Sequence, residues 1–320
     1  MEKAKYLIIT CFIFIYGHVF SQKCINVEYP ENGTITLTKE IQIPKVNSGY
    51  TLWLPSKDTA NGMLVFFHGR RDTASADALI NMALENQLAV LYVTTDNPVE
   101  FLFKKSKMQF IEQQMNEVCT NYGIPQNALL FCGMSLAGTR ALKQSLFYSD
   151  SLSKYRIRPR AIAVCDAPLD MIRFHKEAVK SGQLAFHPLA ANEGIWTSQY
   201  LEKNLGGPPK DAIHEYLDYS IYSYIGGAKN LGPIRSTWVR AYTEPDVHWW
   251  IETRRKDYYG MNAIDLAALV NELKIMGNSH AELVTTRSKG YKPDGQRHPH
   301  SWSIVDEKEL IQWFVNILSN

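Results

Sequence analysis

The sequence lacks the features that mark several large classes of protein. Only five of its 320 residues are cysteines, and they are too scattered for a zinc pattern or a dense disulfide framework. No long lysine or arginine run occurs and the formal net charge is +2, so we expect no nucleic acid partner. We also expect no metal and no cofactor. One disulfide, Cys24 with Cys119, stays open for an oxidising compartment.

A hydrophobic run long enough to span a membrane is missing as well. The apolar stretch 6–16 near the amino terminus is shorter than the about 20 residues that a spanning helix needs. Lys3 and Lys5 precede it and the small residue Ser21 follows, which is typical of a signal peptide cleaved after residue 21. We therefore expect a secreted or periplasmic protein of residues 22–320, with no stable membrane insertion.

What the sequence does contain is an alternation of buried strands and helices. Hydrophobic residues make up 45% of the chain, enough to build one large core. Residues 35–44 and 50–55 have the alternating pattern of a strand hairpin. Further along, short continuous apolar runs alternate with segments of helical spacing. The runs are 63–67, 88–94, 128–132 and 161–165, and the helical segments are 76–86, 108–122 and 136–148. This rhythm predicts an α/β fold with a mostly parallel central sheet flanked by helices.

The rhythm is interrupted once, after the sixth predicted strand. Residues 168–233 are rich in glycine, proline and tyrosine, and we interpret them as an insertion or cap within one domain. Afterwards the alternation resumes. The predicted elements there are a strand at 237–242, a helix at 263–276, a strand at 282–286 and an amphipathic helix at 307–318.

One segment combines a buried strand, a turn of small residues and a helix. It reads Leu-Leu-Phe-Cys-Gly-Met-Ser-Leu-Ala-Gly over residues 129–138. A serine in such a turn projects its hydroxyl above the end of the strand, as a nucleophile elbow requires. The amide N–H of Leu136 would then face a developing oxyanion, with the helix dipole adding to the stabilisation. Ser135 is therefore the predicted nucleophile.

This segment resembles the nucleophile elbow of the α/β-hydrolase superfamily, GxSxG, although here the motif is GxSxA with Gly138 one place later. The His68-Gly69 pair after the strand at 63–67 is similar to the superfamily's HG turn. The resemblance implies the α/β-hydrolase fold and a second oxyanion donor, the amide N–H of Arg70. We expect the ring of His68 only to brace the loop.

A serine nucleophile needs an imidazole base and a carboxylate that orients it, and the superfamily supplies them in the order serine, acid, histidine. Asp246, in the acidic loop after the strand at 237–242, best matches the acid. Glu244 is the substitute and Asp257 a distant third. His300, in the His-Ser-Trp step before the last helix, is preferred to His298 as the base.

These residues predict a secreted serine hydrolase that most closely resembles a carboxylic ester hydrolase. Its expected substrates are small-molecule or carbohydrate esters. Arg71, Trp249 and Trp250 are candidate substrate contacts, although loop arginines are more often solvated and tryptophans more often packed in the core. Two alternatives remain, a peptidase of the same fold and a binding protein that keeps the scaffold without turnover. The oligomeric state is left open.

Overall fold

The centre of the structure is one sheet, in the order β1-β4-β6-β5-β7-β8-β9-β10. The structure is a computed structural model that describes residues 23–56, 59–69 and 76–320. The strands of this sheet are β1 (Lys23–Tyr29), β4 (Ser48–Leu54), β5 (Gly62–Phe66), β6 (Leu88–Thr94), β7 (Leu129–Met134), β8 (Ala161–Cys165), β9 (Trp238–Thr243) and β10 (Ala281–Thr285). A separate hairpin joins β2 (Thr34–Thr36) to β3 (Gln42–Pro44).

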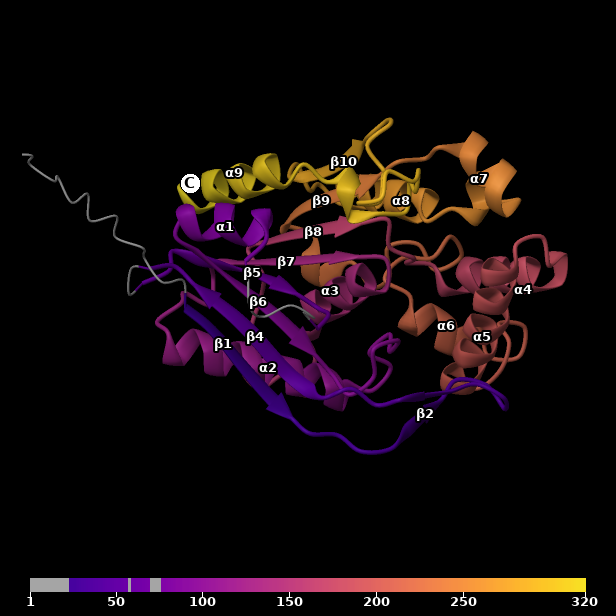
Figure 1. Cartoon of the computed structure of the whole chain (residues 1–320), viewed down its shortest axis with the longest axis horizontal. Coiled ribbons are helices and arrows are strands. Elements are labelled where there is room, and N and C mark those ends of the chain that lie inside the picture. The colour runs from indigo at the N-terminus through magenta and orange to yellow at the C-terminus, as the bar shows by residue number, and fades with distance from the viewer. Residues whose placement is uncertain (1–22, 57–58, 70–75) are drawn as a thin grey trace, which may run out of the picture.

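The strand directions bring the ends of the central strands to one edge. Strands β6, β5, β7, β8, β9 and β10 pair in parallel, whereas β4 is antiparallel to both β1 and β6. Every residue of β5 and of β8 is buried, as expected for strands covered on both faces. The carboxyl ends of β7 and β8 point toward the end of the molecule where α4, α5 and α6 lie (Figure 1).

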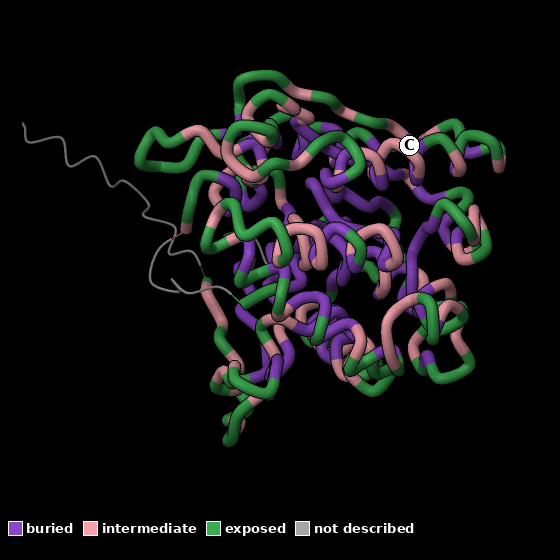
Figure 2. Tube along the Cα trace, turned by 90° about the vertical axis from the view of Figure 1, so that its right-hand side faces the viewer, coloured by how far each residue is buried: buried purple, intermediate pink, exposed green. Residues whose placement is uncertain are grey.

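Helices cover both faces of the sheet. On one face, α1 (Ala78–Glu85) and α9 (Glu307–Leu318) pack against one hydrophobic cluster. On the other face, α2 (Lys105–Asn121), α3 (Leu136–Phe147) and α8 (Ala263–Ile275) pack against a second cluster. The buried segments run through the middle of the molecule and the exposed ones lie around them (Figure 2).

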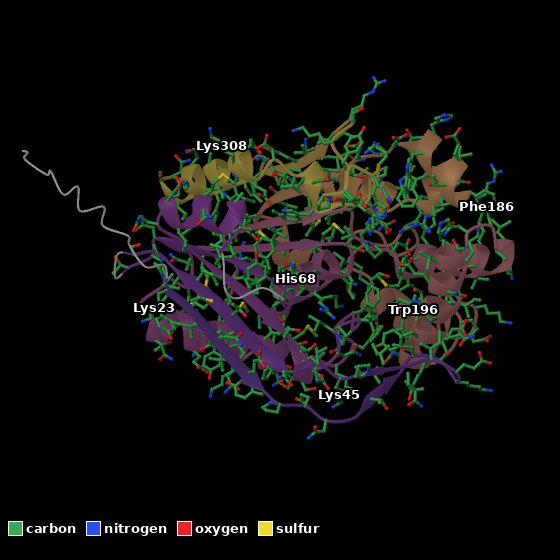
Figure 3. The ribbon with its side chains drawn as sticks, viewed as in Figure 1. Lys23, Lys45, His68, Phe186, Trp196 and Lys308 are labelled. Carbon is green, nitrogen blue, oxygen red and sulfur yellow. The ribbon has the colours of Figure 1, made fainter. Side chains whose placement is uncertain are left out.

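Between β8 and β9 the chain forms three α-helices, α4 (Met171–Leu184), α5 (Pro188–Leu205) and α6 (Ile213–Tyr219), which we call the cap together with the segments that join them. A third hydrophobic cluster joins the cap to the β2–β3 hairpin through Leu37, Tyr200 and Tyr216. A further helix, α7 (Val247–Arg254), follows β9. Phe186 and Trp196 belong to the cap, and His68 lies between the cap and the far end of the sheet in this view (Figure 3).

The predicted α/β architecture is confirmed, and one strand pairing is wrong. The expected hairpin between 35–44 and 50–55 does not form, because β4 pairs with β1 and β6 instead. Cys119 is a buried free thiol, so the structure does not contain the Cys24–Cys119 disulfide that was left open. None of the helices in the described part of the chain is long and apolar enough to cross a membrane.

Candidate active site

Ser135 occupies a sharp turn between the end of β7 and the start of α3. Its backbone has φ 52° and ψ −125°, in a region that non-glycine residues enter at a cost. The turn is tight, since a Cβ on Gly133 would lie 2.3 Å from the carbonyl carbon of Ala137. A Cβ on Gly138 would lie 2.7 Å from that of Ala167. Small residues at these positions therefore permit the strained conformation of Ser135.

Asp166, the residue after β8, lies directly against His300. The Oδ2 atom of Asp166 is 2.5 Å from Nδ1 of His300, which must donate because a carboxylate only accepts. Thr243 donates to Oδ1 of Asp166 at 3.4 Å, and the backbone N–H of Asp166 donates to the carbonyl of Tyr242 at 2.9 Å. Asp166 is only 6% exposed, so its carboxylate is held in one position.

Asp166 also changes the proton affinity of the imidazole. Burial lowers the pKa of His300, but the hydrogen bond to Asp166 and the negative charge of that carboxylate raise it more. The pKa of His300 therefore lies above its ordinary value. With its Nδ1 proton engaged by Asp166, neutral His300 presents an unprotonated Nε2, the atom that a general base needs.

The end of β8 brings the nucleophile and the histidine segment together. The backbone N–H of Ser135 donates to the carbonyl of Cys165 at 2.8 Å. The thiol of Cys165 lies 3.7 Å from the carbonyl oxygen of Ser301, and the next residue, Asp166, contacts His300. Segments that are distant in the sequence thus meet at two consecutive residues, the last of β8 and the one after it.

Asp246 does not orient His300, contrary to the sequence prediction. It caps the amino end of α7 by accepting from the N–H of Trp249 at 3.1 Å, and its Oδ2 accepts from Nη2 of Arg297 at 2.8 Å. The structure corrects the partner of His300 to Asp166, which lies at the end of the strand adjacent to β7. Asp246 follows β9, one strand further from the serine.

The two substitute acids are also engaged elsewhere. Glu244 is buried and accepts from the hydroxyl of Thr286 at 2.8 Å, from the backbone N–H of Lys289 at 3.0 Å and from Arg297. Burial raises the pKa of Glu244, but these hydrogen bonds and the charge of Arg297 lower it below its usual value. Asp257 is exposed and accepts from the N–H of Gly260 at 3.1 Å.

The loop that carries His300 is fixed by Arg297. This side chain bridges Glu244 and Asp246, and its Nη1 donates to the carbonyl of Gly290 at 2.6 Å. Residues 289–300 are thus tied to the loop after β9. Asp246, the predicted acid, and Glu244, its predicted substitute, thus anchor the loop that carries the candidate base.

His298 and the two tryptophans surround His300. The Nδ1 atom of His298 lies 2.7 Å from the carbonyl oxygen of His300, and burial lowers the pKa of His298. Trp249 packs edge-on against His298, with ring centroids 5.5 Å apart, and Trp250 lies 6.4 Å from the ring of His300. Trp250 therefore borders the candidate base His300 directly, whereas Trp249 borders its neighbour His298.

Of the two candidate oxyanion donors, Leu136 and Arg70, the structure describes only Leu136. Leu136 is the first residue of α3, where the backbone N–H has no acceptor within the helix. Arg70 and Arg71 lie outside the described residues. The turn before them is anchored by Arg140, which is 3% exposed and donates to the carbonyls of Phe67 at 3.1 Å and Asn97 at 3.0 Å. His68 contacts the carbonyl oxygen of Gly69 at 3.0 Å through its Nδ1.

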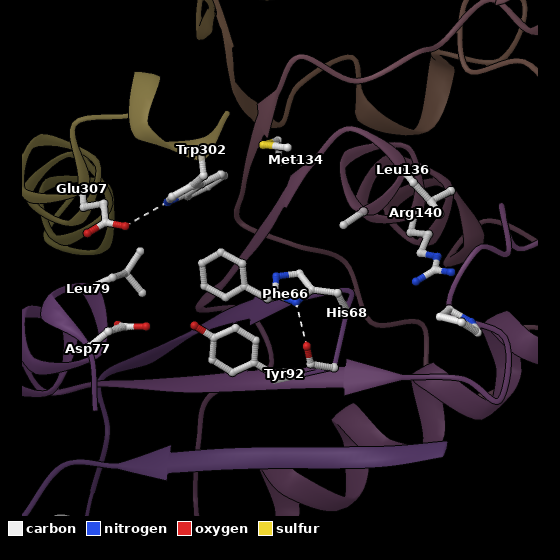
Figure 4. Close-up of a pocket in the computed structure, with 13 residues that line it drawn as sticks. Phe66, His68, Asp77, Leu79, Tyr92, Met134, Leu136, Arg140, Trp302 and Glu307 are labelled. Atoms are coloured by element: carbon white, nitrogen blue, oxygen red, sulfur yellow. Dashed lines mark hydrogen bonds between the residues drawn. The ribbon is translucent and has the colours of Figure 1, made fainter. Parts of the chain in front are cut away.

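A pocket of about 550 Å³ adjoins Ser135, because Met134 and Leu136 on either side of the serine line it. Its volume is within the range of small-molecule sites. Aromatic side chains form much of its wall (Figure 4), including Phe66, Tyr92 and Trp302. The indole N–H of Trp302 donates to Glu307 at 2.9 Å. In the described part of the chain, no three His, Cys, Asp or Glu side chains gather as metal ligands would.

Solved structures of low sequence identity share this fold. Carboxyl esterase 2 from the fungus Tuber melanosporum has a TM-score of 0.53 and 13% identity, covering 95% of this chain and 90% of that one. EstE1, a carboxylesterase from a metagenomic library, has a TM-score of 0.50 and 14% identity, covering 93% and 88%. A prolyl endopeptidase has a TM-score of 0.56 and 13% identity, and this chain spans only 39% of its length while 94% of this chain is covered.

No family model matches the chain, and no curated protein does either. The likeness to these solved structures nevertheless establishes the α/β-hydrolase fold, which the resemblance of the Ser135 turn implied. It does not by itself establish a reaction.

Proposed function

We propose that the protein is a serine hydrolase that cleaves carboxylic esters, with Ser135 as nucleophile, His300 as base and Asp166 as the orienting acid. The observation that carries this proposal is the 2.5 Å bond between His300 and Asp166, at the strand end where the backbone of the strained Ser135 is also bound. Nucleophilic acyl transfer requires a histidine that is oriented by a carboxylate and can take the proton of a serine, and the end of β8 binds both the carboxylate's histidine and the backbone of the strained Ser135.

The reaction starts when Nε2 of His300 accepts the hydroxyl proton of Ser135 while the serine oxygen attacks the ester carbonyl. Asp166 holds the ring and stabilises the imidazolium that forms. The N–H of Leu136 donates to the oxyanion, and the Arg70 amide that the sequence predicts supplies a second donor. His300 then protonates the leaving alcohol. Water, deprotonated by His300, releases the acyl group and regenerates Ser135.

Carbohydrate esters of a secreted or periplasmic environment are the proposed substrates. The signal-peptide pattern of residues 1–21 supports export, and it lies outside the described residues. The aromatic wall beside Ser135 and the tryptophans Trp249 and Trp250 supply apolar faces that suit an acyl group or a sugar ring.

A peptidase is the second candidate, because a prolyl endopeptidase shares the fold. Esters are favoured since two carboxylesterases match over 90% and 88% of their own length, whereas only 39% of that peptidase is matched. A binding protein on the same scaffold would not need a strained serine or a histidine bound to a buried carboxylate.

A fluorophosphonate probe tests the proposal. We expect wild-type protein to be labelled and Ser135→Ala to be unlabelled while its thermal unfolding is unchanged. Acetyl, feruloyl and longer-chain esters assayed beside dipeptide amides then separate esterase from peptidase. Absence of labelling in folded wild-type protein would favour the binding protein.

A further inference from the structure

A second hollow, of about 420 Å³, adjoins the pocket beside Ser135. The two share a common boundary, formed by His68, Gly69, Tyr92, Pro98 and Arg140. We call the second hollow the polar groove. Beyond the boundary its lining includes the apolar residues Val27, Val46 and Tyr50. It also includes polar residues from β1, from β4 and from the residue before β4, namely Asn26, Glu28, Thr51 and Asn47.

The strand register shows where the polar groove lies relative to the serine. Asn26 is paired with Thr51, Thr51 with Tyr92, Tyr92 with Phe66 and Phe66 with Cys132. Residues paired in register project from the same face of a sheet, so this row crosses the sheet from β1 to β7. Four steps of about 4.8 Å span about 19 Å. The last residue of the row, Cys132, is fully buried and lies three residues before Ser135, so the groove reaches the serine through the boundary that the two hollows share.

The polar side chains at the far end hold one another in place. The hydroxyl of Thr51 donates to Oδ1 of Asn26 at 2.8 Å. Asn26 and Asn47 in turn donate to the two oxygens of Glu28, at 2.8 and 2.7 Å. These hydrogen bonds lower the pKa of Glu28, which keeps it an acceptor. Asn26, Glu28 and Asn47 are exposed, so this ordered set of donors and acceptors faces solvent.

The groove changes from polar to aromatic as it approaches the serine. Tyr92 stacks on Phe66 with ring centroids 5.0 Å apart and meets His68 edge-on at 5.3 Å. A sugar chain combines hydroxyl edges, which match amides and carboxylates, with C–H faces, which match aromatic rings. Glu28 is the charged side chain of the polar end, and its negative charge disfavours an acidic polymer.

The direction of the groove argues against a peptide as its occupant. A peptide that adds to a sheet pairs with the backbone of an edge strand, here β1. The polar groove instead crosses the faces of neighbouring strands, where side chains rather than backbone groups are presented.

From these observations we infer that the polar groove binds the neutral oligosaccharide chain of an ester whose scissile bond lies at Ser135. This inference rests on the proposed function and names its substrate class. The chain would extend from the serine past the ends of β5 and β6 and across the middle of β4 and β1, where Thr51 and Asn26 lie, so that recognition grows with the number of sugar units.

Kinetics of Asn26→Leu and Asn47→Leu test the groove, with acetylated xylohexaose and 4-nitrophenyl acetate as substrates. For each variant we measure kcat/KM on acetylated xylohexaose divided by kcat/KM on 4-nitrophenyl acetate. We expect this ratio to fall roughly 10-fold from its wild-type value, as loss of a specific hydrogen-bonding side chain predicts. Asn127→Leu is the matched control, since Asn127 lines a hollow of about 680 Å³ before the start of β7. Ratios that stay within about twofold, as in the control, would overturn the inference.

Binding without turnover separates the groove from the reaction. Calorimetry with Ser135→Ala uses xylohexaose, cellohexaose and mannohexaose and the disaccharide of each. We expect at least one hexasaccharide to bind roughly 10-fold more tightly than its disaccharide, and Asn26→Leu to remove the difference. Lack of length dependence in all three, in a protein that hydrolyses 4-nitrophenyl acetate, refutes the groove and leaves the esterase. Length-dependent binding in a wild-type protein that does not hydrolyse esters refutes the esterase and leaves the groove as a binding site for sugar chains.

Discussion

Replacing Asp166 by asparagine is the sharpest test of the active-site geometry. The substitution would keep the size of the side chain but remove the negative charge that binds the Nδ1 proton of His300. The Oδ2 atom of Asp166 lies 2.5 Å from Nδ1 of His300. Loss of the orienting carboxylate in a serine triad lowers kcat about 10⁴-fold, because the wrong imidazole tautomer is then favoured. At 1.36 kcal/mol per factor of ten, this is about 5 kcal/mol of transition-state stabilisation. We therefore expect Asp166→Asn to lose about 10³- to 10⁴-fold in kcat.

The matched variant is Asp246→Asn, which changes the acid that the sequence favoured. Asparagine caps a helix about as well as aspartate, and Glu244 continues to bind Arg297. We expect a change in kcat of no more than about threefold, the size of a partly exposed ion pair's contribution.

The assay is hydrolysis of 4-nitrophenyl acetate, with the concentration of active sites counted from the initial burst of nitrophenol. Thermal unfolding of both variants shows whether each is folded. A larger loss of kcat in Asp246→Asn than in Asp166→Asn would refute the assignment of the acid. A loss confined to KM in Asp166→Asn would also contradict it, since orientation of the base acts on the chemical step.

Three further outcomes follow from the structure. First, His300 must be neutral to act and its pKa is raised above 6.5, so kcat/KM rises with pH through that higher pKa. The stability that His300 gains from its acid partner is present below about 6.5 and lost as pH rises through the folded pKa, which urea unfolding at several pH values measures. Second, Gly133→Ala places a methyl group 2.3 Å from the backbone of Ala137 and destabilises the fold by about 1–3 kcal/mol, measured by urea unfolding; an unchanged midpoint contradicts the tight turn. Third, Arg297→Met leaves buried Glu244 without its cation and costs about 3 kcal/mol, whereas Arg297→Lys costs less; equal losses in both variants count against the ion pair.

Much of the fold was predictable because its core elements carry strong local patterns. The closing helix, predicted at 307–318, is α9 with the same bounds, and the strand predicted at 161–165 is β8. Continuous apolar runs between helices identify buried parallel strands without any tertiary information. Strand β1 was missed because its residues alternate weakly and its burial depends on β4, its partner in the fold.

The acid of the site shows the limit of sequence reasoning. Both Asp166 and Asp246 follow predicted strands, and both lie between Ser135 and His300 in the chain. Chain order therefore does not separate them. Packing decides which strand lies next to β7, and packing also decides that Arg297 binds Asp246. No local pattern in the sequence contains this information. The one available signal was that Asp166 follows its strand immediately, as Ser135 follows β7.

The contacts made by the end of β8 also determine how the site responds to motion elsewhere. Cys165 holds the amide of Ser135 and Asp166 holds the ring of His300, so a displacement of this strand carries alcohol and imidazole along together. The cap begins only after these two residues, with α4 starting at Met171. Rearranged or exchanged cap helices can thus alter access for incoming molecules while the reacting groups keep their mutual alignment.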